Sequence, residues 1–326
     1  MNLPRRQFLH LAAGAAALLA GLRFARAQSY PARPVRIVVG FAAGGPNDIL
    51  ARLIGHWLSE QLGQQFVVEN RPGAGSNIAT ETVVRATPDG YTLLLVGTPN
   101  AINATLYDNL NFNFVRDIAP VASLMRSGLV VVVHPSVPAR TLPEFIAYAK
   151  ANPGKLSYGS GGIGGITHLT AELFKELAGG LDILHVPYRG AAPALTDLLG
   201  GRVQVLFVNP ALLIGYISAG NVRALAVPTV TRSEVLPDIP SVAEFVPSYE
   251  ASSVFGLGAP KNTPVEIIDT LNQATNAAFA DSKFQTQIAS LDGMILGGSP
   301  ADFSTIIAAE TAKWGKVIRA GNIKAA

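Results

Sequence analysis

The sequence predicts an α/β protein of two lobes with a ligand cleft between them. Strand-like and helix-like segments alternate along the chain, and this alternation restarts near residue 129. Each half also carries a glycine-rich loop between a β-like and a helix-like run, at 40–48 and at 157–167. Alternation of strands and helices favours a parallel sheet covered by helices. Ligands of such sheets bind at the carboxyl ends of the strands, where both loops would lie.

The first half begins with a buried strand at 35–39. A helix follows at 49–62, because its apolar residues recur at helical spacing and share one face. Further strands are expected at 66–68 and 91–96, with helical stretches between them.

The second half repeats this order from a strand at 129–133. A helix is predicted at 142–151, since Thr141 is a favoured N-cap residue and Pro143 suits the first turn. The remaining elements are a helix at 166–178, strands at 183–186, 203–208 and 222–227, and helices at 264–279 and 303–317. The last two helices are expected to return to the first lobe. The predicted domains are therefore 28–128 plus 254–326 for lobe 1 and 129–253 for lobe 2.

Residues 1–27 are interpreted as an export signal of the twin-arginine type. Arg5-Arg6 precede an apolar run of about 12 residues, and the small residues around Arg26 suit cleavage after Ala27. The run is shorter than the roughly 20 residues of a membrane span. An ordinary secretory signal is the alternative, and either route places the mature chain in the periplasm.

Removing the signal changes the charge of the chain. The 25 basic residues include four arginines in 1–27, which leaves 21 basic against 22 acidic residues and a net charge of −1. This balance gives no basic patch for nucleic acid. The chain holds no cysteine, so disulfides and thiolate metal sites are excluded, and its 49% hydrophobic residues supply a large core.

The two glycine loops indicate an anion-binding site. Glycine lets backbone N–H groups approach a ligand, and a helix N-terminus behind the loop adds partial positive charge. We expect the amides of 42–45 and 160–162, with the hydroxyls of Ser160 and Thr167, to bind a carboxylate or phosphate. Asp48 is expected to organise the first loop or its waters.

Two further side chains near these loops have open interpretations. His168, at the start of a predicted helix, either donates to the ligand or caps the turn. Tyr188, after a predicted strand, either turns its hydroxyl into the cleft or has a structural role. The other histidines of the mature chain, His56, His134 and His185, are interpreted as structural.

A dinucleotide-like motif suggests an alternative function. Gly159 to Gly164 satisfies G-x-G-x-x-G before a predicted helix, as in nicotinamide-binding folds. The preceding run at 156–158 is too short and polar for the usual buried strand, so an exported nicotinamide-dependent oxidoreductase is only the alternative. Ser160 does not lie in G-x-S-x-G, and no paired carboxylates or metal-ligand spacing is present. We expect no cofactor, no metal and no catalytic residue.

Eight stretches of the mature chain resemble the Bug-type receptors, the periplasmic solute-binding components of tripartite tricarboxylate transport systems. They are 41–48, 68–75, 88–94, 186–190, 194–201, 223–227, 236–244 and 255–260. The resemblance implies a two-lobed periplasmic-binding-protein fold of type II-like architecture that closes on its ligand. It also implies that the loops at 41–48 and 157–167 clamp a carboxylate, and that the partner is a membrane permease of two further subunits.

Three positions depart from the pattern of the family. Gly40 stands where proline is commoner, which would loosen the first loop. Asn209 follows Val208 where several relatives, including amino-acid binders, carry Asp, and this disfavours an amino-acid ligand. Val254 stands where Trp is frequent, so a cleft-facing position there would admit a bulkier or aromatic acid.

The leading prediction is a receptor for a dicarboxylate, tricarboxylate or aromatic acid, and a sensor that presents its ligand to a signalling partner is a further alternative. The predicted ligand-binding residues are Phe41, Ala42, Ala43, Gly44, Gly45, Asn47, Asp48, Ser160, Gly161, Gly162, Thr167, His168, Tyr188 and Asn209.

Overall fold

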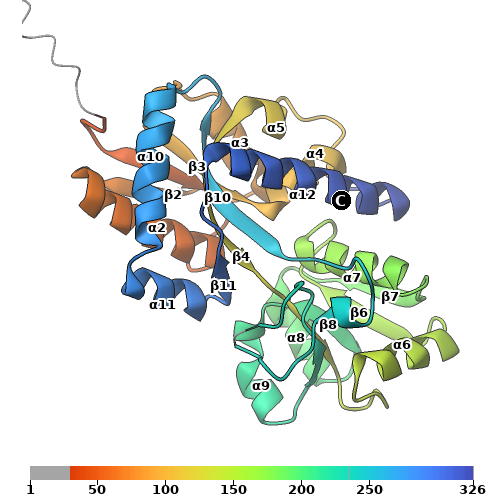
Figure 1. Cartoon of the computed structure of the whole chain (residues 1–326). Helices are drawn as coiled ribbons and strands as arrows, with labels where there is room; N and C mark the ends of the chain where they lie inside the picture. Colours follow the sequence, from red (N-terminus) through yellow and green to blue (C-terminus); the bar gives the residue numbers. More distant parts are fainter. Residues whose placement is uncertain (1–29, 234, 326) are drawn as a thin grey trace, which may run out of the picture.

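The computed structural model describes residues 30–233 and 235–325, and the predicted export signal lies outside this range. The described chain forms two α/β lobes, each built on one sheet (Figure 1). The predicted two-lobed α/β architecture is therefore observed. The exact lobe boundaries at 128/129 and 253/254 stay a prediction.

A six-stranded sheet of order β11-β4-β10-β3-β1-β2 forms the first lobe. Its strands are β1 (Val35–Val39), β2 (Phe66–Asn70), β3 (Thr92–Gly97), β4 (Ile118–Ser127), β10 (Ser253–Pro260) and β11 (Gly293–Ile295). The pairs β1–β2 and β1–β3 are parallel, whereas β10 is antiparallel to both β3 and β4.

A five-stranded sheet of order β7-β6-β8-β5-β9 forms the second lobe. Its strands are β5 (Val130–Val133), β6 (Leu156–Ser160), β7 (Ile183–Pro187), β8 (Val205–Val208) and β9 (Arg223–Ala226). β6 pairs in parallel with β7 and β8, and β5 is antiparallel to β8 and β9. β6 thus lies inside the sheet, and the interpretation of 156–158 as too short and polar for a buried strand was wrong.

Both sheets are mixed, which corrects the prediction of parallel sheets. The chain leaves the first lobe at the end of β4 and re-enters it at the start of β10, and Ser127 is paired with Ser253 at that edge. The two strands that connect the lobes must therefore run in opposite directions. Alternation of strands and helices cannot reveal such a connection, because it reports neighbours in sequence rather than pairing in space.

Helices cover both faces of each sheet. The first lobe carries α2 (Pro46–Leu62), α3 (Asn77–Val84), α4 (Thr98–Leu106), α5 (Phe114–Asp117), α10 (Val265–Ala278), α11 (Ser282–Ser290) and α12 (Pro300–Ala320). The second carries α6 (Leu142–Ala151), α7 (Ile166–Leu177), α8 (Ala191–Leu199) and α9 (Ile214–Ser218). α6 matches its predicted range, and the amide of Glu144 donates to Thr141 Oγ1 at 3.3 Å, as expected for this N-cap.

The core of the second lobe includes residues from α4 and α12. Ile102 and Leu106 of α4 and Trp314 of α12 lie in the same apolar cluster as Phe145 and Phe174 of α6 and α7. Figure 1 shows α12, in dark blue, reaching the boundary between the lobes near α7. The C-terminal helix thus returns to the first lobe as predicted and also packs against the second.

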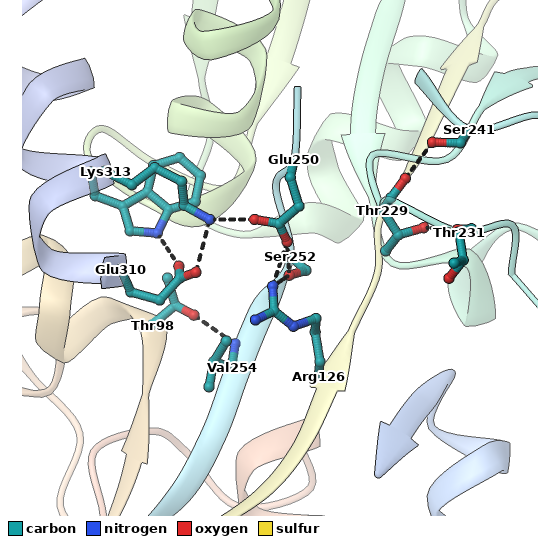
Figure 2. A network of polar contacts seen from close by, with 11 residues as sticks. Thr98, Arg126, Thr229, Thr231, Ser241, Glu250, Ser252, Val254, Glu310 and Lys313 are labelled. Atoms are coloured by element: carbon teal, nitrogen blue, oxygen red, sulfur yellow. Dashed lines mark hydrogen bonds and ion pairs between the residues drawn. The ribbon is translucent and has the colours of Figure 1, made fainter. Parts of the chain in front are cut away.

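A network of charged side chains ties α12 to both connections between the lobes (Figure 2). Lys313 Nζ lies 2.7 Å from Glu250 and 2.8 Å from Glu310, and Arg126 Nη1 lies 2.5 Å from Glu250. Burial alone would raise the pKa of Glu250, but the two cations hold it below its usual value. Arg126 belongs to β4 and Glu250 precedes β10. The network therefore spans the hinge, which is formed by the two segments that connect the lobes.

Candidate functional site

The two glycine loops follow parallel strands at the edges where the two sheets are joined. The first follows β1 and leads into α2, and the second follows β6 and leads into α7. A β-carbon at Gly164 would clash with Leu106 of α4, so the second loop touches the first lobe. The predicted placement of both loops at carboxyl strand ends is observed.

Asp48 is buried beneath the first loop and organises it through hydrogen bonds. Only 3% of this residue is exposed, and its carboxylate accepts the Gly44 N–H at 2.9 Å, Arg52 Nε at 3.0 Å and Asn70 Nδ2 at 2.9 Å. Asn70 Nδ2 also donates to the Phe41 carbonyl at 3.0 Å. The hydrogen bonds from Arg52, and then those from Gly44 and Asn70, lower the pKa of Asp48 to about 2. The buried carboxylate therefore shapes the loop.

The remaining residues of the first loop lie near the surface. Ala42, Ala43 and Gly44 are exposed, whereas Phe41, Gly45 and Asn47 are half-buried. Within the described residues, no acceptor takes the N–H of Ala42 or Ala43. These amides are available to a ligand, while the N–H of Gly44 is already taken by Asp48.

A third loop, at 73–76, packs against the first and was not assigned to the site from sequence. Ala74 and Ser76 have φ values of 45° and 81°, a conformation that costs of order 1–3 kcal/mol per residue outside glycine. Two amides of α4 hold this loop: Asn103 Nδ2 donates to the Gly75 carbonyl at 2.7 Å and Asn100 Nδ2 to Ser76 Oγ at 3.4 Å. Two nearby non-glycine residues with positive φ cannot be recognised from a simple sequence pattern, so the third loop was not predicted.

Gly40 is required by the third loop, and the expectation that glycine loosens the first loop at this position stays a prediction. A β-carbon at Gly40 would overlap Ser76. Gly40→Ala is therefore expected to lower the free energy of unfolding by about 1–3 kcal/mol, as overpacking generally does. Chemical denaturation of the purified variant measures this loss.

Two companion variants test the cause of that loss. Ser76→Gly in the same chain should restore part of the stability, because it removes two of the three overlapping atoms. Gly215→Ala, where a β-carbon meets nothing within 4 Å, should leave stability unchanged or raised. A Gly40→Ala protein as stable as the wild type would contradict the packing argument.

The second loop is held by its own side chains. Thr167 Oγ1 accepts the Gly161 N–H at 2.9 Å, Ser160 Oγ accepts the Gly162 N–H at 3.2 Å, and His168 Nδ1 accepts the Gly164 N–H at 3.0 Å. The amides of Gly161 and Gly162, assigned to the ligand from sequence, are therefore engaged within the loop. Within the described residues, no acceptor takes the N–H of Ile163 or of Ile166 and Thr167 in the first turn of α7.

Two stacked imidazoles lie beneath the second loop. The rings of His168 and His185 stack at 3.9 Å between centroids, with Tyr158 stacked on His185 at 4.8 Å. His185 Nε2 lies 2.7 Å from Ser160 Oγ. Burial, followed by the nearby His185, lowers the pKa of His168 to about 4, and burial also lowers the pKa of His185. His168 thus caps the turn, and His185 contacts the site although its strand position suggested a structural role.

Tyr188 and Asn209 lie at the same edge of the second sheet, after β7 and β8. The Tyr188 hydroxyl donates to Asp197 at 2.7 Å, and burial together with this bond raises its pKa to about 12. Asn209 Nδ2 donates to Ser127 Oγ at 3.4 Å, across the connection between the lobes. The ligand roles of both residues stay predictions.

Val254 does not face a cleft. It is 4% exposed and lies in an apolar cluster with Leu94, Val96 and Phe303. Val254 therefore gives no support for a wider pocket or an aromatic ligand. A valine fits here because the position packs between the sheet and α12.

A cavity of about 710 Å³ lies between the lobes, on the side of the connecting strands opposite to the glycine loops. Its lining includes Arg126 and Leu129, Val227 and Glu250, and Met294 of β11, but none of the predicted ligand-binding residues. β11 and β9 are the outermost strands on this side, whereas β2 and β7 are outermost on the side of the glycine loops. The cavity is thus separate from the predicted site.

Metal binding and membrane insertion find no support in the described part of the chain. Within 30–233 and 235–325, no group of three or more His, Asp or Glu side chains is arranged to hold a metal ion. No helix in the same ranges combines the length and apolarity of a membrane span.

Comparison with known proteins gives a consistent result over nearly the whole chain. The model of the tripartite tricarboxylate transporter family receptor matches residues 50–323. The structure is similar to Rpa4515 of R. palustris with adipate, at 37% identity, a TM-score of 0.79 and coverage of 90% of this chain and 99% of that one.

Two further solved structures agree. The periplasmic binding protein BugD is 32% identical, with a TM-score of 0.76 and coverage of 90% and 99%. MatC from Rhodopseudomonas palustris with bound malate is 29% identical, with a TM-score of 0.75 and coverage of 89% and 100%. These likenesses identify the two-lobed fold as that of periplasmic binding proteins, and they favour binding over the oxidoreductase alternative. The chain belongs to the tripartite tricarboxylate transporter receptor family and is a solute-binding receptor rather than an enzyme.

Proposed function

We propose that this receptor captures a small dicarboxylate or tricarboxylate between its two glycine loops and delivers it to a membrane permease. The observation that carries the proposal is a set of backbone N–H groups, in the loops before α2 and α7 and in the first turn of α7, that have no acceptor among the described residues. They are Ala42 and Ala43 on one lobe and Ile163, Ile166 and Thr167 on the other. Backbone donors at helix N-termini bind anions well.

The charges around the first loop support a clamp made of neutral donors. Arg52 is paired with Asp48 at 3.0 Å, and Arg71 is paired with Glu69 at 2.6 Å. Both guanidinium groups are thus compensated by carboxylates of the protein. A ligand carboxylate at this loop would be held by amides, with closure of the lobes bringing in the second set of donors.

Two similar structures indicate the class of ligand. One contains adipate and the other malate, both dicarboxylates. Neither an aromatic acid nor an amino acid receives comparable support here, because Val254 is buried and Asn209 replaces the acid expected for an ammonium group. We therefore favour a dicarboxylate.

The proposed place of action is the periplasm. Residues 1–27 have the features of a twin-arginine signal, cleaved after Ala27. BugD, a periplasmic binding protein, supports the same compartment. The family supports delivery to a membrane permease of two further subunits as the next step.

A thermal-shift screen of residues 28–326 tests the proposal. The panel comprises adipate, malate, citrate, benzoate, aspartate and NAD. A ligand at about 100 times its Kd adds roughly 2.7 kcal/mol to the free energy of unfolding. We expect at least one dicarboxylate or tricarboxylate to raise the melting temperature and to bind in isothermal titration calorimetry. Stabilisation by NAD alone, or by none of the acids, would overturn the proposal.

A further inference from the structure

A continuous chain of hydrogen bonds joins His185 to the second glycine loop. His185 Nε2 lies 2.7 Å from Ser160 Oγ, and that hydroxyl accepts the Gly162 N–H at 3.2 Å. The Gly162 carbonyl lies 3.3 Å from the same hydroxyl. Ser160 is 1% exposed, so its hydroxyl links the imidazole to the loop from within the protein.

The single proton of Ser160 has two possible directions, and the proton on His185 decides between them. When Nε2 carries no proton, Ser160 donates to it. When Nε2 carries a proton, the imidazole donates to Ser160 Oγ, and the serine proton turns toward the loop. A charged imidazole carries protons on both nitrogens, so only the second direction is compatible with it.

His168 is held neutral beside it. Its Nδ1 accepts the Gly164 N–H at 3.0 Å, and a proton on Nδ1 would break this bond. The two rings stack at 3.9 Å, so two positive charges on the pair would repel each other strongly. The stacked pair therefore accommodates one positive charge, and the additional proton binds to His185.

We propose that His185 is a positioning residue for the second glycine loop and takes up a proton when a carboxylate is captured there. This inference rests on the proposed function. The negative charge of the ligand favours the charged imidazole, and the charged imidazole fixes the Ser160 proton toward the loop. Binding and protonation then support each other.

The charged groups that face His185 do not by themselves fix its protonation state. From α7 it faces His168, the carboxylate of Glu172 and the ammonium of Lys175, and from β6 the Tyr158 ring. Burial lowers the pKa of His185, Glu172 raises it and Lys175 lowers it. Lys175 lies 2.7 Å from Glu172, so these charges largely compensate each other. A ligand carboxylate adds a negative charge that shifts His185 toward the charged form, against the effect of burial.

Calorimetric titration of the wild-type receptor with adipate at pH 6.5 to 8.5 tests the coupling. Adipate stays ionised across this range, so changes in affinity report on the protein. Uptake of a proton on binding makes the affinity rise as pH falls, by up to about tenfold per pH unit. We expect binding about threefold or more tighter at pH 6.5. The binding enthalpy should also differ between phosphate and Tris buffers, which have different ionisation enthalpies.

Titrations of the His185→Gln and His134→Gln variants show whether the pH dependence of adipate binding arises from His185. Glutamine can still donate to Ser160 but cannot titrate, so His185→Gln should bind adipate with a flat pH profile. His134, bonded to Ser136 at 2.7 Å, is the matched control and should retain the wild-type profile. Ser160→Ala, which breaks the chain of hydrogen bonds, serves if His185→Gln fails to fold, and should reduce the pH dependence.

The outcomes separate the two proposals. No binding of any carboxylate by the wild type refutes the proposed function itself. Binding with equal affinity across the pH range and equal enthalpy in both buffers refutes the role of His185 alone. The same refutation follows if His185→Gln keeps the wild-type pH profile.

Discussion

Asp48→Ala is expected to weaken carboxylate binding at least tenfold and to lower the free energy of unfolding by about 2–4 kcal/mol. The carboxylate is buried and joins the Gly44 N–H, Arg52 and Asn70, and Asn70 in turn holds the Phe41 carbonyl. Without it, the loop loses the bonds that fix its conformation. The donors for the ligand would then no longer be held in place before binding.

Denaturation and calorimetric titration of the same preparation measure both effects. Asp269→Ala provides the control, since this exposed aspartate of α10 should change stability by no more than about 0.5 kcal/mol. A loss near 1 kcal/mol with unchanged affinity would instead mean that Asp48 acts only as a favourable charge in the first turn of α2.

The stability contributed by Asp48 should also depend on pH. Its pKa is lowered from an ordinary 3.8 to about 2 in the folded protein. The contribution is therefore complete above about pH 4 and is lost as the pH falls toward 2. In Asp48→Ala, the difference in stability from the wild type should shrink over that acidic range.

Lys313→Met is expected to lower the free energy of unfolding by about 2–3 kcal/mol, because it leaves two carboxylates at the hinge with too little positive charge. Lys313 lies within 2.8 Å of both Glu250 and Glu310 and is 23% exposed. Arg126 remains beside Glu250, and Trp314 Nε1 still donates to Glu310 at 2.7 Å. These partners limit the loss.

Carboxylate affinity should change as well, although Lys313 lies outside the glycine loops. The network joins α12 to both connections between the lobes, so weakening it alters the free-energy difference between open and closed forms. Lys316→Met, on an exposed position of the same helix, is the control and should behave as the wild type. Unchanged stability and affinity in Lys313→Met would contradict a structural role for the network.

Much of the fold could be predicted from local sequence. The strand at 35–39 and the helix at 142–151 were predicted with the observed bounds, since apolar runs and capping residues act locally. β4, β10 and β11 were missed, and the antiparallel pairing of β3 and β5 was not foreseen. Their pairing is set by contacts between distant segments, such as Ser127 with Ser253.

The candidate site was predictable in outline only. Glycines at strand ends indicated both loops, and Asp48 was correctly expected to organise the first one. The chain could not show that Thr167 and Ser160 bind amides of their own loop, because this depends on side-chain direction. The contact of His185 with Ser160 was not predicted, since one polar residue in an edge strand resembles a solvent-facing position until its partner, His168, is placed beside it.

The position of Trp314 in the core of the second lobe has a consequence for synthesis and export. Every strand of that lobe lies within 130–226, yet its core is completed by Trp314, Val317 and Ile318, near the end of the chain. We therefore expect the second lobe to stay unfinished on the ribosome until translation is almost complete. A transcript truncated before α12 would yield neither lobe in native form. Under the proposed twin-arginine route, which carries folded proteins, a chain that lacks α12 would therefore not be exported.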